Sequence, residues 1–360
     1  MLIAKKSNCT DIALCSRTLN LIWQLTDWAP LHLLTLTFSR LQAVEVAKDC
    51  FARSLVKKLC CFNRTLCVAT SMELLRLTYL LFALTAFFPK CAESLGTWSY
   101  HGEENPDTWK YHYRDCGGRN QSPVAIVPKD TIFDAGLADL TINYEPNVSA
   151  FLQNNGHSVQ ATFLTGKSNI SGGGLPSSRF QAAQLHFHWG SENSRGSEHQ
   201  VNGRKYPMEI HIVHYNAEKY PNASTAMTMA DGLAVLGILV ELQANDNPVL
   251  NVIVERLEKI PYKYDNVTLD SLQPYSFLPR DIAQFYTYKG SLTTPGCFES
   301  VRWFVFNHTF GISEAQLEKF RSSTFDRKRQ DTKKSHLSDN FRPVQPLNGR
   351  TVTRSFSKYD

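Results

Sequence analysis

The chain has 360 residues, enough for one large domain with additional segments or for two domains. Its formal net charge is only +5 and its basic residues are scattered, which argues against nucleic acid as a partner. Hydrophobic residues make up 42% of the sequence, so the composition is that of an ordinary globular protein with a sizeable core.

Residues 1–71 differ from the rest of the chain. No sustained helical or strand period runs through them, and their cysteines show no recognisable pairing pattern. A zinc module built from Cys60, Cys61 and Cys67 is an alternative, but these cysteines lack the spaced pairs that are usual in such modules. The sequence assigns this extension no function and leaves open whether the mature protein contains it. Six of the nine cysteines lie here, at Cys9, Cys15, Cys50, Cys60, Cys61 and Cys67.

Residues 72–94, MELLRLTYLLFALTAFFPKCAES, have the layout of a secretory signal peptide. The apolar run Leu77–Phe88 is about twelve residues, which is too short to span a bilayer comfortably. Because the segment is internal, three interpretations stand: Met72 is the true start, the segment is a signal-anchor, or it is a buried helix. We favour the first, with cleavage after Ser94. It predicts a secreted, extracellular protein.

The remaining cysteines and the glycosylation triplets favour secretion, and no C-terminal membrane anchor is expected. Only Cys116 and Cys297 remain after that cleavage, and two distant cysteines in a secreted chain suggest one disulfide, with two buried thiols as the alternative. There is no apolar C-terminal tail that would anchor the chain in a membrane. A glycoprotein is expected from acceptor triplets at Asn120 (weakened by the nearby Pro123), Asn147, Asn169, Asn222, Asn266 and Asn307.

Residues 95–360 alternate short β-rich runs with turns rich in Gly, Pro, Asn and Ser, which indicates one mixed domain dominated by strands. Two helices are predicted, Asn247–Lys259 and Ser313–Ser322, the second with Ser313 as its cap. The predicted strands are Ser149–Gln153, Ser158–Phe163, Gln184–Trp189, Glu209–Tyr215, Leu233–Leu242 and Val301–Phe306.

Two of these runs carry a concentration of histidines. Alternate residues of a strand share a face, so Gln184, His186 and His188 point the same way. In the second run Glu209, His211 and Val213 share a face. Three imidazoles from neighbouring strands form the ligand set of a catalytic zinc, and polar neighbours such as Gln184 and Glu209 suit its second shell of hydrogen bonds. The alternative is a set of inert, hydrogen-bonded strand histidines.

Four segments resemble the active-site motifs of the alpha-class carbonic anhydrases: LHFHWGS, GSEHQVNG, EIHIVHYN and GSLTTP. The similarity runs from about Trp98 to Phe356. It implies a single large, twisted, mostly antiparallel sheet with a few short peripheral helices and a metal at the bottom of a conical cleft. It also implies reversible hydration of carbon dioxide by zinc-bound hydroxide, with proton export through a histidine.

The resemblance assigns roles to particular residues. His186, His188 and His211 would bind zinc, with Gln184, Glu209 and the Asn340 carbonyl as their hydrogen-bond partners. Thr293 and Glu198 would orient the hydroxide, and His157 would be the proton shuttle. The water network would involve Tyr100, Asn155 and Gln160, the carbon dioxide pocket Val213, Val235, Leu292, Thr294, Val301 and Trp303, and the disulfide Cys116 with Cys297.

One departure from the family pattern concerns Gly296, which stands where a second proline usually follows Pro295. The family commonly has a cis bond there, and a cis bond to glycine costs several times more. Either the bond is trans and the loop shifts, or the surroundings enforce it. His199 and His214 are expected to be structural.

Two other function classes are compatible with such a fold. A matrix or binding protein on the same fold would lack a ligand histidine, Glu198 or Thr293, and none is missing. A zinc esterase would use the same site. The sequence does not indicate the oligomeric state.

Overall fold

The structure is a computed structural model that describes residues 98–357 except Ala138. These residues belong to one compact unit, Ala92–Asp360. The interpretations of residues 1–71 and 72–94 therefore lie outside the described residues. Among the described residues, no helix combines the length and the apolar character that crossing a lipid bilayer requires.

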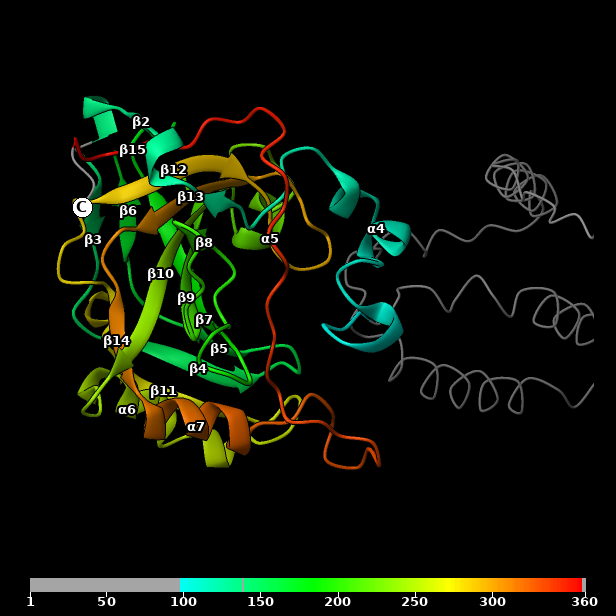
Figure 1. The fold of residues 1–360 in the computed structure, drawn as a ribbon. Coiled ribbons are helices and arrows are strands. Elements are labelled where there is room, and N and C mark those ends of the chain that lie inside the picture. Colours follow the sequence, from blue (N-terminus) through cyan, green and yellow to red (C-terminus); the bar gives the residue numbers. More distant parts are fainter. Residues whose placement is uncertain (1–97, 138, 358–360) are drawn as a thin grey trace, which may run out of the picture. The chain divides into compact units, whose positions relative to one another are not determined.

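A mixed sheet of thirteen strands dominates the unit, as expected (Figure 1). Its path runs β11-β4-β5-β7-β9-β10-β13-β12-β15-β2, with β3, β6 and β14 attached at the side. Most pairs are antiparallel, but β13 and β14 pair with β10 in parallel, and β2 pairs with β15 in parallel. β1 and β8 form a separate parallel pair. The strands are β1 (Ala125–Ile126), β2 (Ile132–Phe133), β3 (Thr141–Asn143), β4 (Val148–Asn154), β5 (Val159–Phe163), β6 (Asn169–Ser171), β7 (Phe180–Trp189), β8 (Gln200–Val201), β9 (Met208–Asn216), β10 (Leu233–Gln243), β11 (Asn266–Leu272), β12 (Phe285–Gly290), β13 (Val301–Phe306), β14 (Phe310–Ser313) and β15 (Thr353–Arg354).

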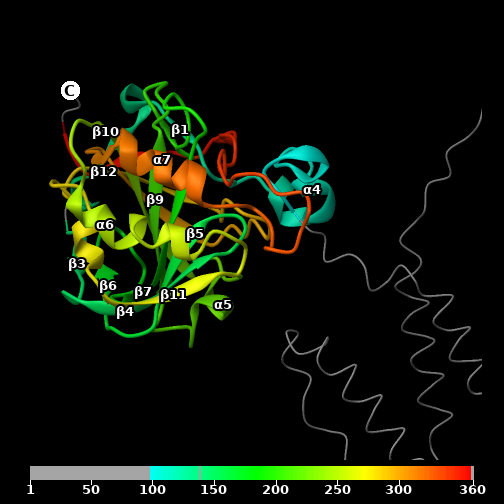
Figure 2. The ribbon, with the colours of Figure 1, turned by 90° about the horizontal axis from the view of Figure 1, so that it is seen from below.

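The described helices are few and short. They are α4 (Trp109–His112), α5 (Ala223–Ala226), α6 (Pro248–Val254) and α7 (Glu314–Ser323). The predicted helix Asn247–Lys259 is α6 followed by a separate 3-10 turn, Leu257–Lys259. Ser313 caps α7 as expected, in a capping box with Gln316. The Gln316 side chain also donates to the Asn247 carbonyl at 2.8 Å, which ties α7 to α6. Figure 2, which looks from below Figure 1, shows the two helices lying across one side of the sheet.

The central strands β9 and β10 are buried on both faces. Ile210 and Ile212 of β9 pack in one apolar cluster, while Val213 packs in another with Val235 and Trp303. This division follows strand alternation, because neighbouring side chains point to opposite faces. His211 shares the face of Val213, so the second cluster borders the candidate site.

Candidate metal centre

The three predicted ligands meet across one strand pair. In the antiparallel register of β7 and β9, His186 lies directly opposite His211, and His188 follows two residues later on the same face. The ring centroids of His188 and His211 are 4.6 Å apart, and those of His186 and His211 are 5.1 Å apart. One nitrogen from each ring lies within 4.8 Å of the other two. The structure thus brings together the set that alternation predicted.

A hydrogen bond on the far side of each ring fixes which nitrogen faces its neighbours. His186 Nδ1 donates to Gln184 Oε1 at 2.9 Å, and His188 Nδ1 donates to the Asn340 carbonyl at 2.7 Å. His211 Nε2 donates to a carboxylate oxygen of Glu209 at 2.8 Å. The acceptors leave His186 Nε2, His188 Nε2 and His211 Nδ1 for a shared ligand. All three expected partners are in place.

The chemistry of these nitrogens suits a metal cation. His188 Nε2 is buried with no hydrogen-bond partner, which is an expensive state for a polar atom unless something binds it. Burial lowers the pKa of His188 to about 4 and that of His186 well below its usual value. The rings are therefore neutral near pH 7, and neutral imidazole is the form that coordinates zinc. These residues could hold zinc.

Glu209 connects a ligand to a second buried histidine. It accepts from His199 Nδ1 at 2.7 Å and from the His199 backbone N–H at 2.8 Å, in addition to His211. Burial alone raises the pKa of Glu209, but His199 and His211 outweigh it and hold the pKa well below the usual range. The other nitrogen of His199 bonds to the Tyr288 hydroxyl at 2.7 Å. His199 is thus a hydrogen-bonding support, as expected.

His214 lies on the opposite face of β9. Its ring contacts the Tyr144 hydroxyl at 2.6 Å and the Ala234 carbonyl at 3.2 Å. His214 is therefore a structural residue, as expected, and lies outside the candidate metal centre.

Glu198 lies beside the ligand nitrogens, as the resemblance implies. Its Oε2 is 3.6 Å from His188 Nε2 and 3.9 Å from His211 Nδ1, and it has no hydrogen-bond partner of standard geometry. Its Oε1 accepts from the Arg342 backbone N–H at 2.8 Å. Burial raises the pKa of Glu198, whereas His211, the Arg342 N–H and the nearby Thr293 hydroxyl lower it. Thr293 and Glu198 are therefore neighbours.

In the loop after Thr293 the peptide bond between Pro295 and Gly296 is trans, which is one of the two expected outcomes. Among the described residues the only cis peptide bond is Ser122–Pro123, so the Pro295–Gly296 bond is trans. Gly296 adopts φ +100°, a region that glycine favours, and the Cys297 N–H closes a turn on the Thr294 carbonyl at 2.9 Å. Gly296 thus lets the loop turn without the cis peptide bond to a second proline that is common in the family.

A cavity of about 360 Å³ opens onto the three imidazoles and Thr293. Five of the six predicted pocket residues line it: Val213, Val235, Leu292, Thr294 and Trp303. Val301 does not; it packs in the adjoining apolar cluster, and its β10 partner Leu233 lines the cavity instead. Strand alternation could have found Leu233, which shares a face with Val235. The sequence offered no such signal for Met227, Ala223, Ala183 or Trp98.

His157 also lines this cavity and stacks on Trp98, with ring centroids 3.7 Å apart. Burial and the positive charges of Lys263 and Arg327 together lower the pKa of His157 to about 3. Tyr100, Asn155 and Gln160 line the cavity as expected. Asn155 has an additional role: its Oδ1 accepts from the His157 N–H at 2.9 Å and so shapes the turn that carries the histidine.

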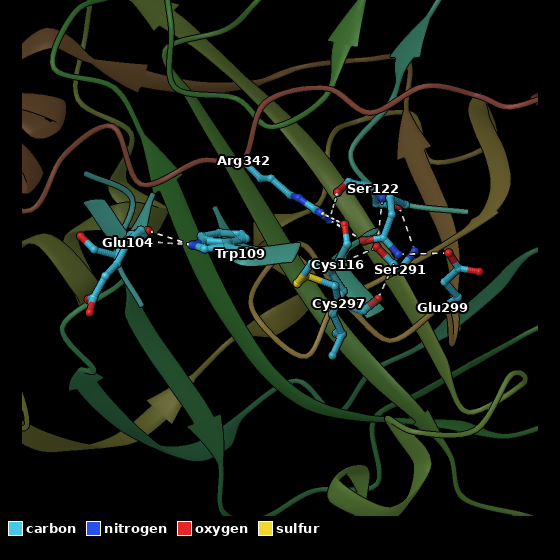
Figure 3. The surroundings of a disulfide bond; sticks show 11 residues. Glu104, Trp109, Cys116, Ser122, Ser291, Cys297, Glu299 and Arg342 are labelled. Atoms are coloured by element: carbon cyan, nitrogen blue, oxygen red, sulfur yellow. Dashed lines mark hydrogen bonds between the residues drawn. A yellow bond between two sulfur atoms is a disulfide. The ribbon is translucent and has the colours of Figure 1, made fainter. Parts of the chain in front are cut away.

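Cys116 and Cys297 form a disulfide, as expected (Figure 3). It joins the segment after α4 to the loop that follows Thr293. The covalent link therefore lies close to one of the candidate catalytic residues.

Comparisons with known proteins agree with this geometry. Residues 104–356 match the family described as eukaryotic-type carbonic anhydrase. Over 261 residues the chain is 39% identical to carbonic anhydrase 7 of Mus musculus and 38% identical to carbonic anhydrase 7 of Homo sapiens. Each alignment covers 72% of this chain and 97% of the relative.

Proposed function

The chain belongs to the eukaryotic-type carbonic anhydrase family, and on that premise we propose that His157 exports the proton and that Thr293 and Glu198 align the nucleophile. Membership of the family makes the protein a carbonate dehydratase, a zinc lyase that hydrates carbon dioxide to bicarbonate. The observation that carries the proposal is that the three neutral imidazoles, Thr293 and His157 line one cavity, with Glu198 Oε2 3.6 Å from His188 Nε2.

The site residues divide the remaining work. When bound, zinc makes water acidic enough to provide a nucleophile near neutral pH, as in characterised carbonic anhydrases, where the pKa is about 7. The Thr293 hydroxyl would accept a hydrogen bond from the nucleophile while its own O–H donates a hydrogen bond to the Glu198 carboxylate. The apolar wall around Val213 and Val235 admits a nonpolar substrate and excludes competing water.

His157 is suited to carry the proton because it lines the cavity that holds the nucleophile. In its position on Trp98, however, a pKa of about 3 makes it a weak proton acceptor. Transfer from a donor of pKa about 7 is then uphill by roughly 5 kcal/mol. We therefore expect proton export to limit turnover when little buffer is present.

The metal assignment is tested by His211→Ala. We expect the purified variant to lose bound zinc and hydration activity while its circular dichroism stays that of the wild type. A variant that kept both its zinc and its hydration rate would contradict the ligand assignment.

The shuttle is tested by His157→Ala. Because the shuttle acts after bicarbonate forms, we expect kcat for hydration to fall about tenfold or more in dilute buffer, with kcat/KM unchanged. Free imidazole in the assay should restore kcat. An unchanged kcat in dilute buffer would exclude His157 as the shuttle.

We also propose that the protein is secreted and glycosylated. The signal-like segment 72–94, the acceptor triplets and the disulfide, a bond typical of oxidising compartments, support this. Mass spectrometry of protein from the medium of expressing cells would test it. A mature chain that still contains residues 1–71, or a product retained in the cytosol, would contradict it.

A further inference from the structure

Arg342 is a buried cation beside the disulfide. Its side chain is 2% exposed and lies over the Trp109 ring at 5.7 Å. The guanidinium donates from Nη1 to Gln121 Oε1 at 2.8 Å and to the Ser122 carbonyl at 3.0 Å, and from Nη2 to the Cys116 carbonyl at 3.0 Å (Figure 3). The guanidinium is thus fixed to one short stretch of chain, residues 116–122.

The backbone of Arg342 contacts the other side of the site. Its N–H donates to Glu198 Oε1 at 2.8 Å, and two residues earlier the Asn340 carbonyl accepts from the metal ligand His188. Residues 338–347 lie in no helix or strand. Within residues 338–344 no backbone–backbone hydrogen bond to another described residue holds the chain, and the next one is Gln345 N–H to the Pro123 carbonyl at 2.7 Å, so the position of residues 338–344 depends on side-chain contacts.

The same short stretch also holds the loop of Thr293. Gln121 Nε2 donates to the Cys297 carbonyl at 3.1 Å, and the disulfide joins Cys116 to Cys297. Ser122 and Ser291 exchange two hydrogen bonds, Ser122 N–H to Ser291 Oγ at 2.9 Å and Ser291 N–H to Ser122 Oγ at 3.0 Å. Residues 116–122 are therefore tied to Thr293 through its loop and to Glu198 through Arg342.

We propose that the Arg342 guanidinium is a positioning group for hydration: it anchors the backbone N–H that aims Glu198 at Thr293. This inference rests on the proposed function, because it assumes that the Thr293–Glu198 pair aligns the nucleophile. Stability alone does not explain the residue, since apolar side chains often fill a buried ionic site as well or better. Its Nε, moreover, is buried without a hydrogen-bond partner.

The test is Arg342→Leu, which keeps much of the volume and removes all three side-chain hydrogen bonds. A misaligned nucleophile slows the chemical step, and a displacement of about 1 Å can cost roughly 100-fold. We expect kcat/KM for carbon dioxide hydration to fall about 10- to 100-fold. In dilute buffer kcat should fall much less, because proton export limits it. Zinc content and the fraction of folded protein are measured alongside.

Two variants sharpen the comparison. Arg342→Lys keeps the charge but not the planar fork of donors, so we expect an intermediate kcat/KM. Arg350→Leu is the matched control: Arg350 Nη2 donates to the Gln121 carbonyl at 2.7 Å in the same stretch, whereas its other hydrogen bonds go to the Lys289, Pro346 and Leu347 carbonyls, all outside residues 338–344. It should keep kcat/KM near the wild-type value.

Partial unfolding or zinc loss would lower kcat and kcat/KM by one common factor, and that result in Arg342→Leu would overturn the inference. A large fall in kcat/KM with a much smaller fall in kcat in Arg350→Leu would also overturn the inference. If Arg342→Leu does not fold, Arg342→Lys carries the test, and an unchanged kcat/KM there would overturn the inference. A zinc-loaded wild type that fails to hydrate carbon dioxide would refute the proposed function itself, and the inference with it.

Discussion

After burial, the positive charge beside His157 is the main influence on how well that ring can carry a proton. The Lys263 side chain lies against Gly156, where an added Cβ would approach Lys263 Cδ to 2.4 Å. The Lys263 N–H donates to the Arg327 carbonyl at 2.9 Å, so two cationic residues from separate loops are held together near the turn that carries His157. Both positive charges disfavour a protonated His157.

Lys263→Gln should therefore favour proton export. Removing the charge raises the pKa of His157 from about 3 toward 6.5, although burial keeps it below that value. We expect a higher kcat in dilute buffer and an unchanged kcat/KM, checked together with the His157 titration by NMR. Lys219→Gln, at a surface lysine paired with Asp231, is the control. A His157 titration that does not move would refute this electrostatic account.

At this scale the sequence predicts short-range partners and misses long-range ones. Gln184 and Glu209 follow from strand alternation, because each lies two residues from its histidine. The Asn340 carbonyl is 152 residues from His188, and only the family resemblance pointed to it. The effects of Lys263 and Arg327 on His157 depend on loop packing, for which the sequence carries no local signal.

At the scale of elements, the spacing between β9 and β10 leaves room for the carboxylate that supports the candidate metal ligand His211. Gly237 of β10 lies opposite His211. A Cβ at Gly237 would meet Glu209 Oε1 at 3.2 Å and Val305 Cγ2 at 3.5 Å. The missing side chain therefore accommodates the carboxylate that orients His211.

Gly237→Val should displace that carboxylate. Since hydrogen-bond partners of metal ligands typically contribute 10- to 100-fold to affinity, we expect zinc binding to weaken by about that factor. Competition with a chelator measures it. Gly237→Ala, which adds only the Cβ, should have a smaller effect. Equal affinities in Gly237→Val and the wild type would show that Glu209 tolerates the intrusion.

The six predicted strands all exist, most of them within one or two residues of their expected ends. β10 and β12 show why some elements are easier to find than others. The long apolar run of β10 is unmistakable, whereas β12, with five of its six residues buried, has no alternation to detect. Strands of two or three residues, such as β2 and β15, are too short to establish a period.

At the scale of the whole molecule, buried neutral histidines tie stability to pH. The pKa of both His157 and His214 is about 3, lowered by burial and, for His157, also by the charges of Lys263 and Arg327, against about 6.5 in an unfolded chain. The unfolded state therefore binds more protons between those values. The stabilisation is complete above pH 6.5 and is lost as the pH falls toward 3.

His214→Gln should make the zinc-free protein less sensitive to acid. Removing one such group lowers the slope of unfolding free energy against pH by up to about 1.4 kcal/mol per pH unit between pH 6 and 4. Urea unfolding at several pH values measures the slope. Parallel curves for the variant and the wild type would mean that His214 does not contribute.

The overall architecture could be predicted because long, ordered motifs connected the chain to a known family. Composition and periodicity alone reached only a mixed domain dominated by strands. They could not supply the order of strands in the sheet, since pairs such as β11 with β4 join segments more than a hundred residues apart. Secretion and glycosylation stay predictions.

The disulfide between Cys116 and Cys297 closes a covalent ring with a sequence separation of 181 residues. All three candidate metal-ligand histidines lie inside this ring, while Asn340 and Arg342 lie on the tail outside it. A protease that nicks the ring once leaves both fragments linked until a reductant separates them. A single cut in the exposed stretch around Lys328–Gln330 leaves no covalent bond to hold the tail, and the ligand His188 then keeps its carbonyl partner only by noncovalent contacts.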